Sequence, residues 1–241
     1  MMLAARGAFL AARRKKGWRN PYVTDGLVAQ YDGEWNVGGG VHDASAATWK
    51  DLSGNGNDCT LSQWATWTDN GLSCDGTHYA AMAPSAGIED TWYCEIVYDR
   101  VLTQYGYLCY LTSHKIGTSQ KSSAFQISFK NSAVMLGSGT VIKDGTYVST
   151  FYANIPLKAS ISVDFSNVKL KINNVDQPAS SGSENWSQTT IGEIGGRFAR
   201  TGNVYKGTIN SIRLYSRALT AEEIAANYAV DKARFNLPDA T

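Results

Sequence analysis

The chain has 241 residues and a formal net charge of +1; 18% of the residues are charged, 43% hydrophobic and 11% aromatic. This composition excludes a disordered chain, which would carry more charge and fewer aromatic residues. The 23 glycines against 5 prolines favour strands joined by tight turns over a helical bundle. The length suits one sizeable core, or at most two small ones. No run of about 18 apolar residues is present, so no membrane span is expected.

The charge is unevenly divided along the chain. Residues 1–20 hold six basic and no acidic side chains, so residues 21–241 hold 16 basic and 21 acidic side chains, a net −5. We expect residues 1–21 to form an arm and linker that docks on an assembly partner or on a second copy of the chain. A frayed, solvated terminus is the alternative, and contact with nucleic acid is not expected. The basic side chains of the predicted arm are Arg6, Arg13, Arg14, Lys15 and Lys16.

The start of the chain does not fit a secretion signal. Its basic cluster at residues 13–16 follows the short apolar stretch, whereas a signal peptide carries its positive charge first. We therefore expect synthesis in a bacterial cytoplasm without export by the ordinary signal route.

Alternation of apolar and polar residues predicts strands from residue 22 onward. The clearest hairpin comprises residues 159–165 and 168–172, joined by a turn at Ser166 and Asn167. Each of these strands has one apolar and one polar face, which is typical of half-buried antiparallel sheet. Further strands are predicted at residues 27–32, 91–102, 105–112, 124–129, 190–194 and 207–215.

One helix is predicted near the end of the chain. Thr220 and Glu223 have the spacing of a capping box, in which each side chain accepts the other residue's backbone N–H. Ile224 and Tyr228, with Ala225 as a third candidate, supply the apolar face. Many strands and one terminal helix predict an all-β fold, a two-sheet antiparallel sandwich with a short C-terminal helix.

The four cysteines lie at Cys59, Cys74, Cys94 and Cys109, without a Cys-x-x-Cys pair. A structural zinc site is therefore not expected. Cys74 and Cys94 alternate with apolar residues as core residues of strands do, so reduced core thiols are predicted, with disulfides as the alternative.

Four stretches of the chain carry a family resemblance. They are YKGTINSIRLYSRALTAEEI at 205–224, DGLVAQY at 25–31, DLSGNGN at 51–57 and KLKINNV at 169–175. Together they resemble laminin-G-like jelly-roll domains of the concanavalin A-like lectin and glucanase group. The resemblance spans about residues 22–235, leaves 236–241 as a C-terminal tail, and implies two sheets packed as a jelly roll. The basic arm beside one such domain is also similar to small proteins encoded by phages and prophages of gut bacteria.

The residues needed for catalysis on this fold are not recognisable. Glycoside hydrolases of this group commonly carry Glu-x-Asp-x-x-Glu on one strand, which places paired carboxylates on one face. Glu95 and Asp99 come nearest, with Val97 where a further acid would stand, so we expect two solvent-facing acids. The histidines stand alone, and no His-Glu-x-x-His or Gly-x-Ser-x-Gly motif is present: His42, His78 and His114. We predict no catalytic residue and no required cofactor.

Calcium is the metal for which the sequence offers ligands. Asp51, Asn55, Asn57 and Asp58 place hard oxygen ligands on one tight turn. The alternative is that these side chains bond to their own backbone, as in Asx turns.

Aromatic residues in predicted loops could stack against sugar rings. Core packing or a subunit interface is the alternative for each of them. The candidates for glycan contact are Trp35, Trp64, Trp67, Tyr79 and Trp186.

These features together predict a non-catalytic binding or structural module. We expect a phage-encoded virion or surface protein associated with a tail or capsid, with the arm as its anchor and the sandwich displayed toward cell-surface glycans. A free carbohydrate-binding lectin is the main alternative, followed by a glycoside hydrolase.

Overall fold

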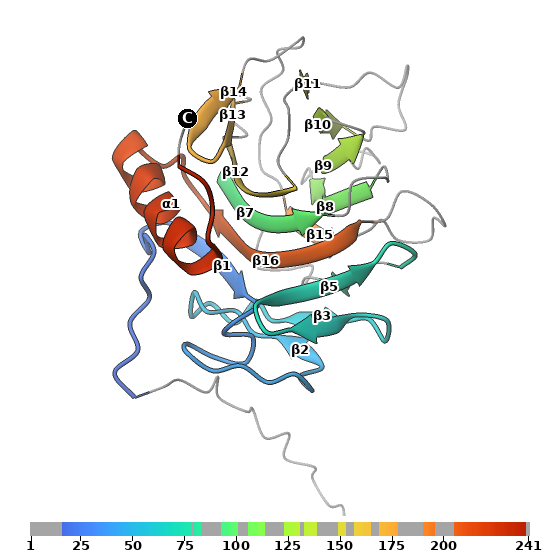
Figure 1. The fold of residues 1–241 in the computed structure, drawn as a ribbon, viewed down its shortest axis with the longest axis vertical. Helices are drawn as coiled ribbons and strands as arrows, with labels where there is room; N and C mark the ends of the chain where they lie inside the picture. The colour runs from blue at the N-terminus through green and yellow to red at the C-terminus, as the bar shows by residue number, and fades with distance from the viewer. Residues whose placement is uncertain are drawn as a thin grey trace, which may run out of the picture.

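A computed structural model describes residues 16–78, 80–82, 93–100, 106–113, 123–130, 133–138, 149–152, 157–164, 169–177, 190–195 and 205–239. These residues form two antiparallel sheets of eight strands each and one C-terminal helix (Figure 1). The all-β sandwich predicted from the sequence is therefore confirmed. No helix in the described part of the chain is long and apolar enough to cross a membrane.

The first sheet is built around the long strand β16, which pairs with β7 on one side and with both β5 and β1 on the other. Its strand order is β14-β13-β12-β7-β16-β5-β4. The strands are β1 Leu27–Asp32, β4 Thr66–Thr68, β5 Gly71–Asp75, β7 Tyr93–Arg100, β12 Lys158–Asp164, β13 Lys169–Ile172, β14 Val175–Gln177 and β16 Lys206–Tyr215.

The second sheet has the order β11-β10-β9-β8-β15-β6-β3-β2. Its strands are β2 Thr48–Trp49, β3 Cys59–Leu61, β6 Ala81–Met82, β8 Gly106–Ser113, β9 Ser123–Lys130, β10 Ala133–Ser138, β11 Ser149–Tyr152 and β15 Thr190–Ile194. One buried apolar cluster joins the two sheets, since it includes Trp49 and Ile194 of the second sheet with Ile96, Ile161 and Leu214 of the first.

The hairpin predicted from alternation is confirmed as β12 and β13, with Ile161 opposite Ile172. Its polar face differs from the prediction, because Ser160 and Ser162 are buried instead of facing solvent. The reason is that helix α1 (Ala221–Phe235) covers this outer face of the first sheet, and the Ser160 hydroxyl donates to Asp231 of that helix at 3.3 Å.

The capping box that begins α1 is confirmed. The Glu223 backbone N–H donates to the Thr220 hydroxyl at 3.3 Å, and the Thr220 N–H donates to the Glu223 carboxylate at 2.9 Å. Ala225 is exposed, so its predicted place on the buried face is wrong. Polar Asn227 and Asp231 occupy the buried face together with apolar residues, because the sheet beneath offers charged and polar partners.

Arg213 of β16 is the centre of a buried ion network. Its guanidinium lies 2.8 Å from the Glu95 carboxylate of β7 and bonds both Asp231 oxygens, at 2.9 and 2.5 Å. Glu95 is therefore buried, which corrects the prediction of a solvent-facing acid, whereas Asp99 is exposed as predicted. Because its carboxylate neutralises Arg213 beneath the helix, Glu95 serves to hold α1 on the sheet.

The chain enters the sandwich along the same helix. The Tyr22 hydroxyl donates to Asp231 at 2.8 Å, and Trp18 packs edge-on against Trp35 with ring centroids 5.5 Å apart. Asn20, within the linker predicted from the sequence, donates to Gln30 of β1 at 2.5 Å. Residues 18–25 thus pack on the sandwich. Of the predicted docking side chains only Lys16 lies within the described residues; Arg6, Arg13, Arg14 and Lys15 lie outside them.

Three thiols pack as core residues on or beside the strands: Cys59, Cys74 and Cys94 are buried and free of disulfides. The side chain of Cys109 lies outside the described part. Burial raises the pKa of the Cys59 thiol to about 12, so this group is protonated and unreactive at neutral pH.

Candidate functional site

Trp64 presents an exposed aromatic ring in the loop between β3 and β4. Its side chain is 44% exposed, and its ring stacks on His78 with centroids 3.9 Å apart and planes 6° from parallel. The imidazole covers one face of the indole. The exposed area therefore lies on the opposite face and on the ring edges, where a flat ligand can reach it.

A tight turn after β5 fixes the imidazole that supports Trp64. Asp75 accepts the backbone N–H groups of Thr77 at 2.7 Å and His78 at 2.9 Å, and its second oxygen lies 2.8 Å from His78 Nδ1. The Thr77 hydroxyl also donates to Asp75, at 2.6 Å. Because of these bonds His78 has little freedom to move away, and Trp64 rests on a preformed support.

The same bonds determine the charge beside the ring. Burial acts to raise the pKa of Asp75, but the hydrogen bonds from Thr77 and His78 outweigh it and hold that pKa well below its usual range. Asp75 is therefore ionised across the neutral range. An exposed carboxylate and an exposed threonine thus bond to the imidazole that supports the indole.

Two other tryptophans predicted as glycan contacts, Trp35 and Trp67, lie within the described residues. Both pack against the protein. Trp67 lies edge-on to Trp49 at 5.4 Å, and its Nε1 donates to the Ala46 carbonyl at 2.8 Å. Trp35 has the Arg234 guanidinium 3.5 Å from its ring centroid. Both rings are half-buried, so Trp64 is the most accessible of the three. The remaining two candidates, Tyr79 and Trp186, lie outside the described residues.

The turn predicted to bind calcium uses its carboxylates within the protein. Asp51 accepts the backbone N–H groups of Gln30, Ser53 and Asn57 at 2.9 to 3.0 Å. Asp58 accepts the Asp51 N–H at 2.9 Å. Its other oxygen accepts from Lys50 at 2.5 Å.

The amide side chains of the same turn tie it to β1. Asn55 and Asn57 donate through Nδ2 to the Val28 carbonyl, at 2.9 and 3.0 Å. Within the described ranges, no three His, Cys, Asp or Glu side chains are grouped closely enough to hold a metal ion. Calcium binding at Asp51, Asn55, Asn57 and Asp58 stays a prediction, and these contacts explain the turn without a metal.

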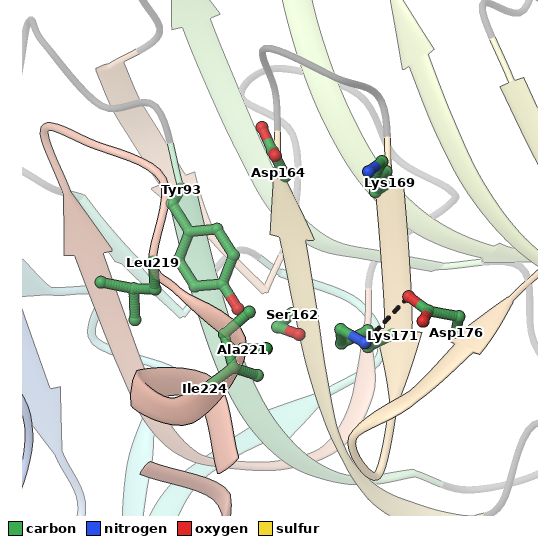
Figure 2. Close-up of a pocket in the computed structure, with 9 residues that line it drawn as sticks. All are labelled: Tyr93, Ser162, Asp164, Lys169, Lys171, Asp176, Leu219, Ala221 and Ile224. Atoms are coloured by element: carbon green, nitrogen blue, oxygen red, sulfur yellow. Dashed lines mark ion pairs between the residues drawn. The ribbon is translucent and has the colours of Figure 1, made fainter. Parts of the chain in front are cut away.

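A hollow lies toward the edge of the first sheet opposite to the one beside Trp64. It is a pocket of about 250 Å³ between the start of α1 and the outer face of β7, β12, β13 and β14. Figure 2 shows apolar side chains on one side and charged ones on the other. The lining residues are Tyr93, Ser162, Asp164, Lys169, Lys171, Asp176, Leu219, Ala221 and Ile224.

Sequence reasoning missed this pocket because its walls come from separate segments of the chain. The alternation that predicted the hairpin does hold one signal, since Ser162, Asp164, Lys169 and Lys171 all fall on its polar face. Only the position of α1 shows that this polar face borders a pocket and not open solvent.

Comparisons with known proteins relate the chain to others by fold. No protein-family model matches the sequence, and no curated protein matches it. Among solved structures, Trypanosoma rangeli sialidase in complex with sialic acid has a TM-score of 0.54 at 14% identity over 87% of this chain. The match covers 33% of the sialidase, so the present chain spans about a third of that protein's length.

A smaller protein matches over nearly its whole length. Domain 4 of AbnA, a GH43 extracellular arabinanase from Geobacillus stearothermophilus in complex with arabinotriose, has a TM-score of 0.51 at 16% identity. The match covers 84% of this chain and 98% of that domain. At these identities the likeness shows a shared fold, one that also occurs in carbohydrate-active proteins.

Proposed function

We propose that the chain is a non-catalytic glycan-binding module in which Trp64 is the platform for a sugar ring. The observation that carries the proposal is the exposed indole held on a fixed imidazole, with ring centroids 3.9 Å apart. Single exposed apolar side chains are common on protein surfaces, so exposure alone does not indicate a site. The Trp64 ring is also held from one face by a hydrogen-bonded turn, and this prior ordering favours a ligand-binding role.

The chemistry of the platform suits a saccharide. One face of a pyranose or furanose ring presents C–H groups that pack on an aromatic face, while its hydroxyls need polar partners at the rim. The Thr77 hydroxyl beside His78 is exposed and donates to Asp75, so it offers a sugar hydroxyl an acceptor position. Because His78 already holds the indole in place, little conformational entropy is lost when a sugar binds.

The structural neighbours indicate which ligands to test first. The arabinanase domain is described with arabinotriose and the sialidase with sialic acid. Arabino-oligosaccharides and sialylated glycans are therefore the first ligands for this chain, alongside a broad glycan array.

The proposal extends to the family and the setting of the module. The sequence at 205–224 supports a laminin-G-like jelly roll, and the basic residues within 1–20 support an arm that attaches the module to a virion or surface assembly.

A truncation tests the role of the arm. Residues 18–25 pack on the sandwich, so the informative truncation removes only residues 1–15. This deletion should abolish attachment of the module to the virion or surface assembly. It should leave glycan binding and thermal stability unchanged. Unchanged assembly would contradict the role of the arm.

Affinity measurements on matched variants test the glycan platform. After an array identifies a glycan, calorimetric titration should show that Trp64→Ala weakens binding by about tenfold or more, as for an aromatic residue at the centre of a contact. The matched control is Leu157→Ala, which removes a side chain of equal exposure, 45% against 44%, at another place. Equal affinities for Trp64→Ala and the wild type, or no glycan bound by the wild type, would contradict the proposal.

The absence of catalysis is tested on the same ligands. Prolonged incubation with the bound polysaccharide should release no reducing ends. Turnover that is lost on replacing a single carboxylate would show that the module is a hydrolase.

A further inference from the structure

The pocket beside the start of α1 has two unlike walls. Leu219 and Ile224 form an apolar wall together with the ring of Tyr93, and Lys171 and Asp176 lie on the polar side (Figure 2). A volume of about 250 Å³ is below the roughly 300–1,000 Å³ of sites for drug-sized ligands, so it suits a single small ring.

The polar wall carries donors and acceptors in balance. Lys171 Nζ lies 2.9 Å from Asp176 Oδ1, and the pocket holds two lysines and two aspartates in all. An ammonium group has three donors and a carboxylate has about four acceptor positions, so the ion pair leaves most of both sets unused. Two neighbouring hydroxyls of a sugar, each both donor and acceptor, can bond to this pair without breaking it.

The Tyr93 hydroxyl is buried behind the pocket wall and is covered from solvent. It makes no hydrogen bond of ordinary length to a described residue. Burial strongly raises the pKa of Tyr93, and the neighbouring Ser162 lowers it by less, so the phenol is neutral. Tyr93 therefore borders the pocket with its ring, and the Lys171–Asp176 ion pair is left to make the polar contacts of a ligand.

From these features we infer that the pocket lined by Tyr93, Lys171, Asp176, Leu219 and Ile224 is a second binding site, for one neutral sugar residue. An ionic ligand fits less well, because it would exchange the existing ion pair for others of the same kind in a partly exposed place, where such pairs add little. The apolar wall receives the C–H face of the sugar ring. The inference extends the proposed function but does not depend on Trp64.

The two sites lie too far apart to hold one small sugar. Five strand spacings separate β13 from β4 in the first sheet, or about 24 Å at roughly 4.8 Å each. The sites therefore bind separately, and a surface dense in glycans can occupy both at once. Such two-site attachment raises the overall affinity above that of either site alone.

Titration of the full chain with single sugars tests the pocket. Arabinose, galactose, glucose and N-acetylglucosamine are added in turn while amide resonances are followed by NMR. We expect at least one sugar to shift signals of Ser162, Lys171 and Ile224. Free leucine is titrated as a control, because it probes a site for an amino acid. If leucine shifts the signals of these residues and none of the sugars does, the inference is overturned.

Two pocket variants and a matched control distinguish a specific loss of sugar binding in the pocket from a general loss of folded protein. Ala221→Phe fills the pocket from an exposed position, and Lys171→Met with Asp176→Leu removes the ion pair without leaving a lone charge. Each should weaken sugar binding by about tenfold or more at an unchanged melting temperature. Lys232→Met with Asp239→Leu, which removes another surface Lys–Asp pair, should leave binding unchanged. Full binding by both pocket variants would overturn the inference.

The Trp64 variant separates this inference from the proposed function. Trp64→Ala should retain single-sugar binding in the pocket while it weakens binding at the platform. If the pocket variants change no titration while Trp64→Ala abolishes glycan binding, the pocket is no sugar site and the platform stands. If only the pocket variants lose binding, the pocket stands and the platform fails.

Discussion

Replacing Asp231 with alanine should destabilise the sandwich more than any loss of a surface charge. The Asp231 carboxylate lies under α1 and accepts two hydrogen bonds from Arg213 and one each from Tyr22 and Ser160. Arg213 is fully buried, so it cannot turn to water when its partner is removed. The change therefore removes the carboxylate acceptor of two Arg213 N–H groups and of the Tyr22 hydroxyl, which stay buried between the helix and the first sheet.

The expected magnitude follows from what remains around Arg213. Breaking a buried ion pair by removal of one partner costs about 3–5 kcal/mol. Arg213 keeps its 2.8 Å ion pair with Glu95, which favours the lower half of that range, about 3–4 kcal/mol. Domains of ordinary stability have about 5–15 kcal/mol in total, so the variant should fold but unfold easily.

Urea denaturation followed by tryptophan fluorescence measures this effect. With an m-value of about 3 kcal/mol/M, the midpoint should fall by about 1 M or more. The matched control is Asp25→Ala, which removes a carboxylate that is 84% exposed and 2.8 Å from Arg217. Its cost should be about 0–1 kcal/mol. Equal midpoints for the Asp231 and Asp25 variants would refute the role assigned to the buried network.

Three further predictions concern the helix cap and a core thiol. Thr220→Ala removes the cap of α1 and should lower the free energy of unfolding by about 0.5–2 kcal/mol in the same urea assay, whereas Thr220→Ser should lower it far less. Hydrogen bonds from Arg217 and from the Thr220 backbone N–H lower the pKa of Glu223 to about 2. The stability that Glu223 contributes should therefore be present above about pH 4.3, the pKa of a free glutamate, and be lost as the pH falls toward about 2. The urea midpoints of the wild type and Glu223→Gln should converge at that low pH. A difference in midpoint that stays constant with pH would contradict this. Cys59, with a pKa of about 12, should react with iodoacetamide at about pH 8 far more slowly in the folded protein than in urea, as measured by mass spectrometry, and equal rates would contradict its burial.

The elements that the sequence predicts well are those set by local patterns. The β12–β13 hairpin follows from alternation, and the start of α1 follows from the spacing of Thr220 and Glu223. The buried network does not follow from such patterns, because charged residues are usually exposed and Glu95 and Arg213 lie 118 positions apart. Only the pairing of β7 with β16 brings them together.

In the candidate site, too, some features follow from local sequence patterns and others only from tertiary packing. Trp64 and Trp67 are alike in the sequence, yet one ring lies at the surface and the other packs on Trp49. The difference arises from tertiary packing, and the support under Trp64 comes from His78, beyond β4 and β5. An aromatic residue in a predicted loop could be named as a candidate, but its exposure and its fixed partner could not.

Stacking of a sugar on Trp64 is tested most directly by the indole signals of the seven tryptophans. A proton–nitrogen NMR spectrum recorded during titration with the identified glycan reports each indole N–H separately, and single Trp→Phe variants assign the signals. The Trp64 signal should shift and saturate with the same dissociation constant that calorimetry gives, while the buried Trp49 signal stays in place. Saturable binding that leaves the Trp64 signal unmoved would contradict the platform.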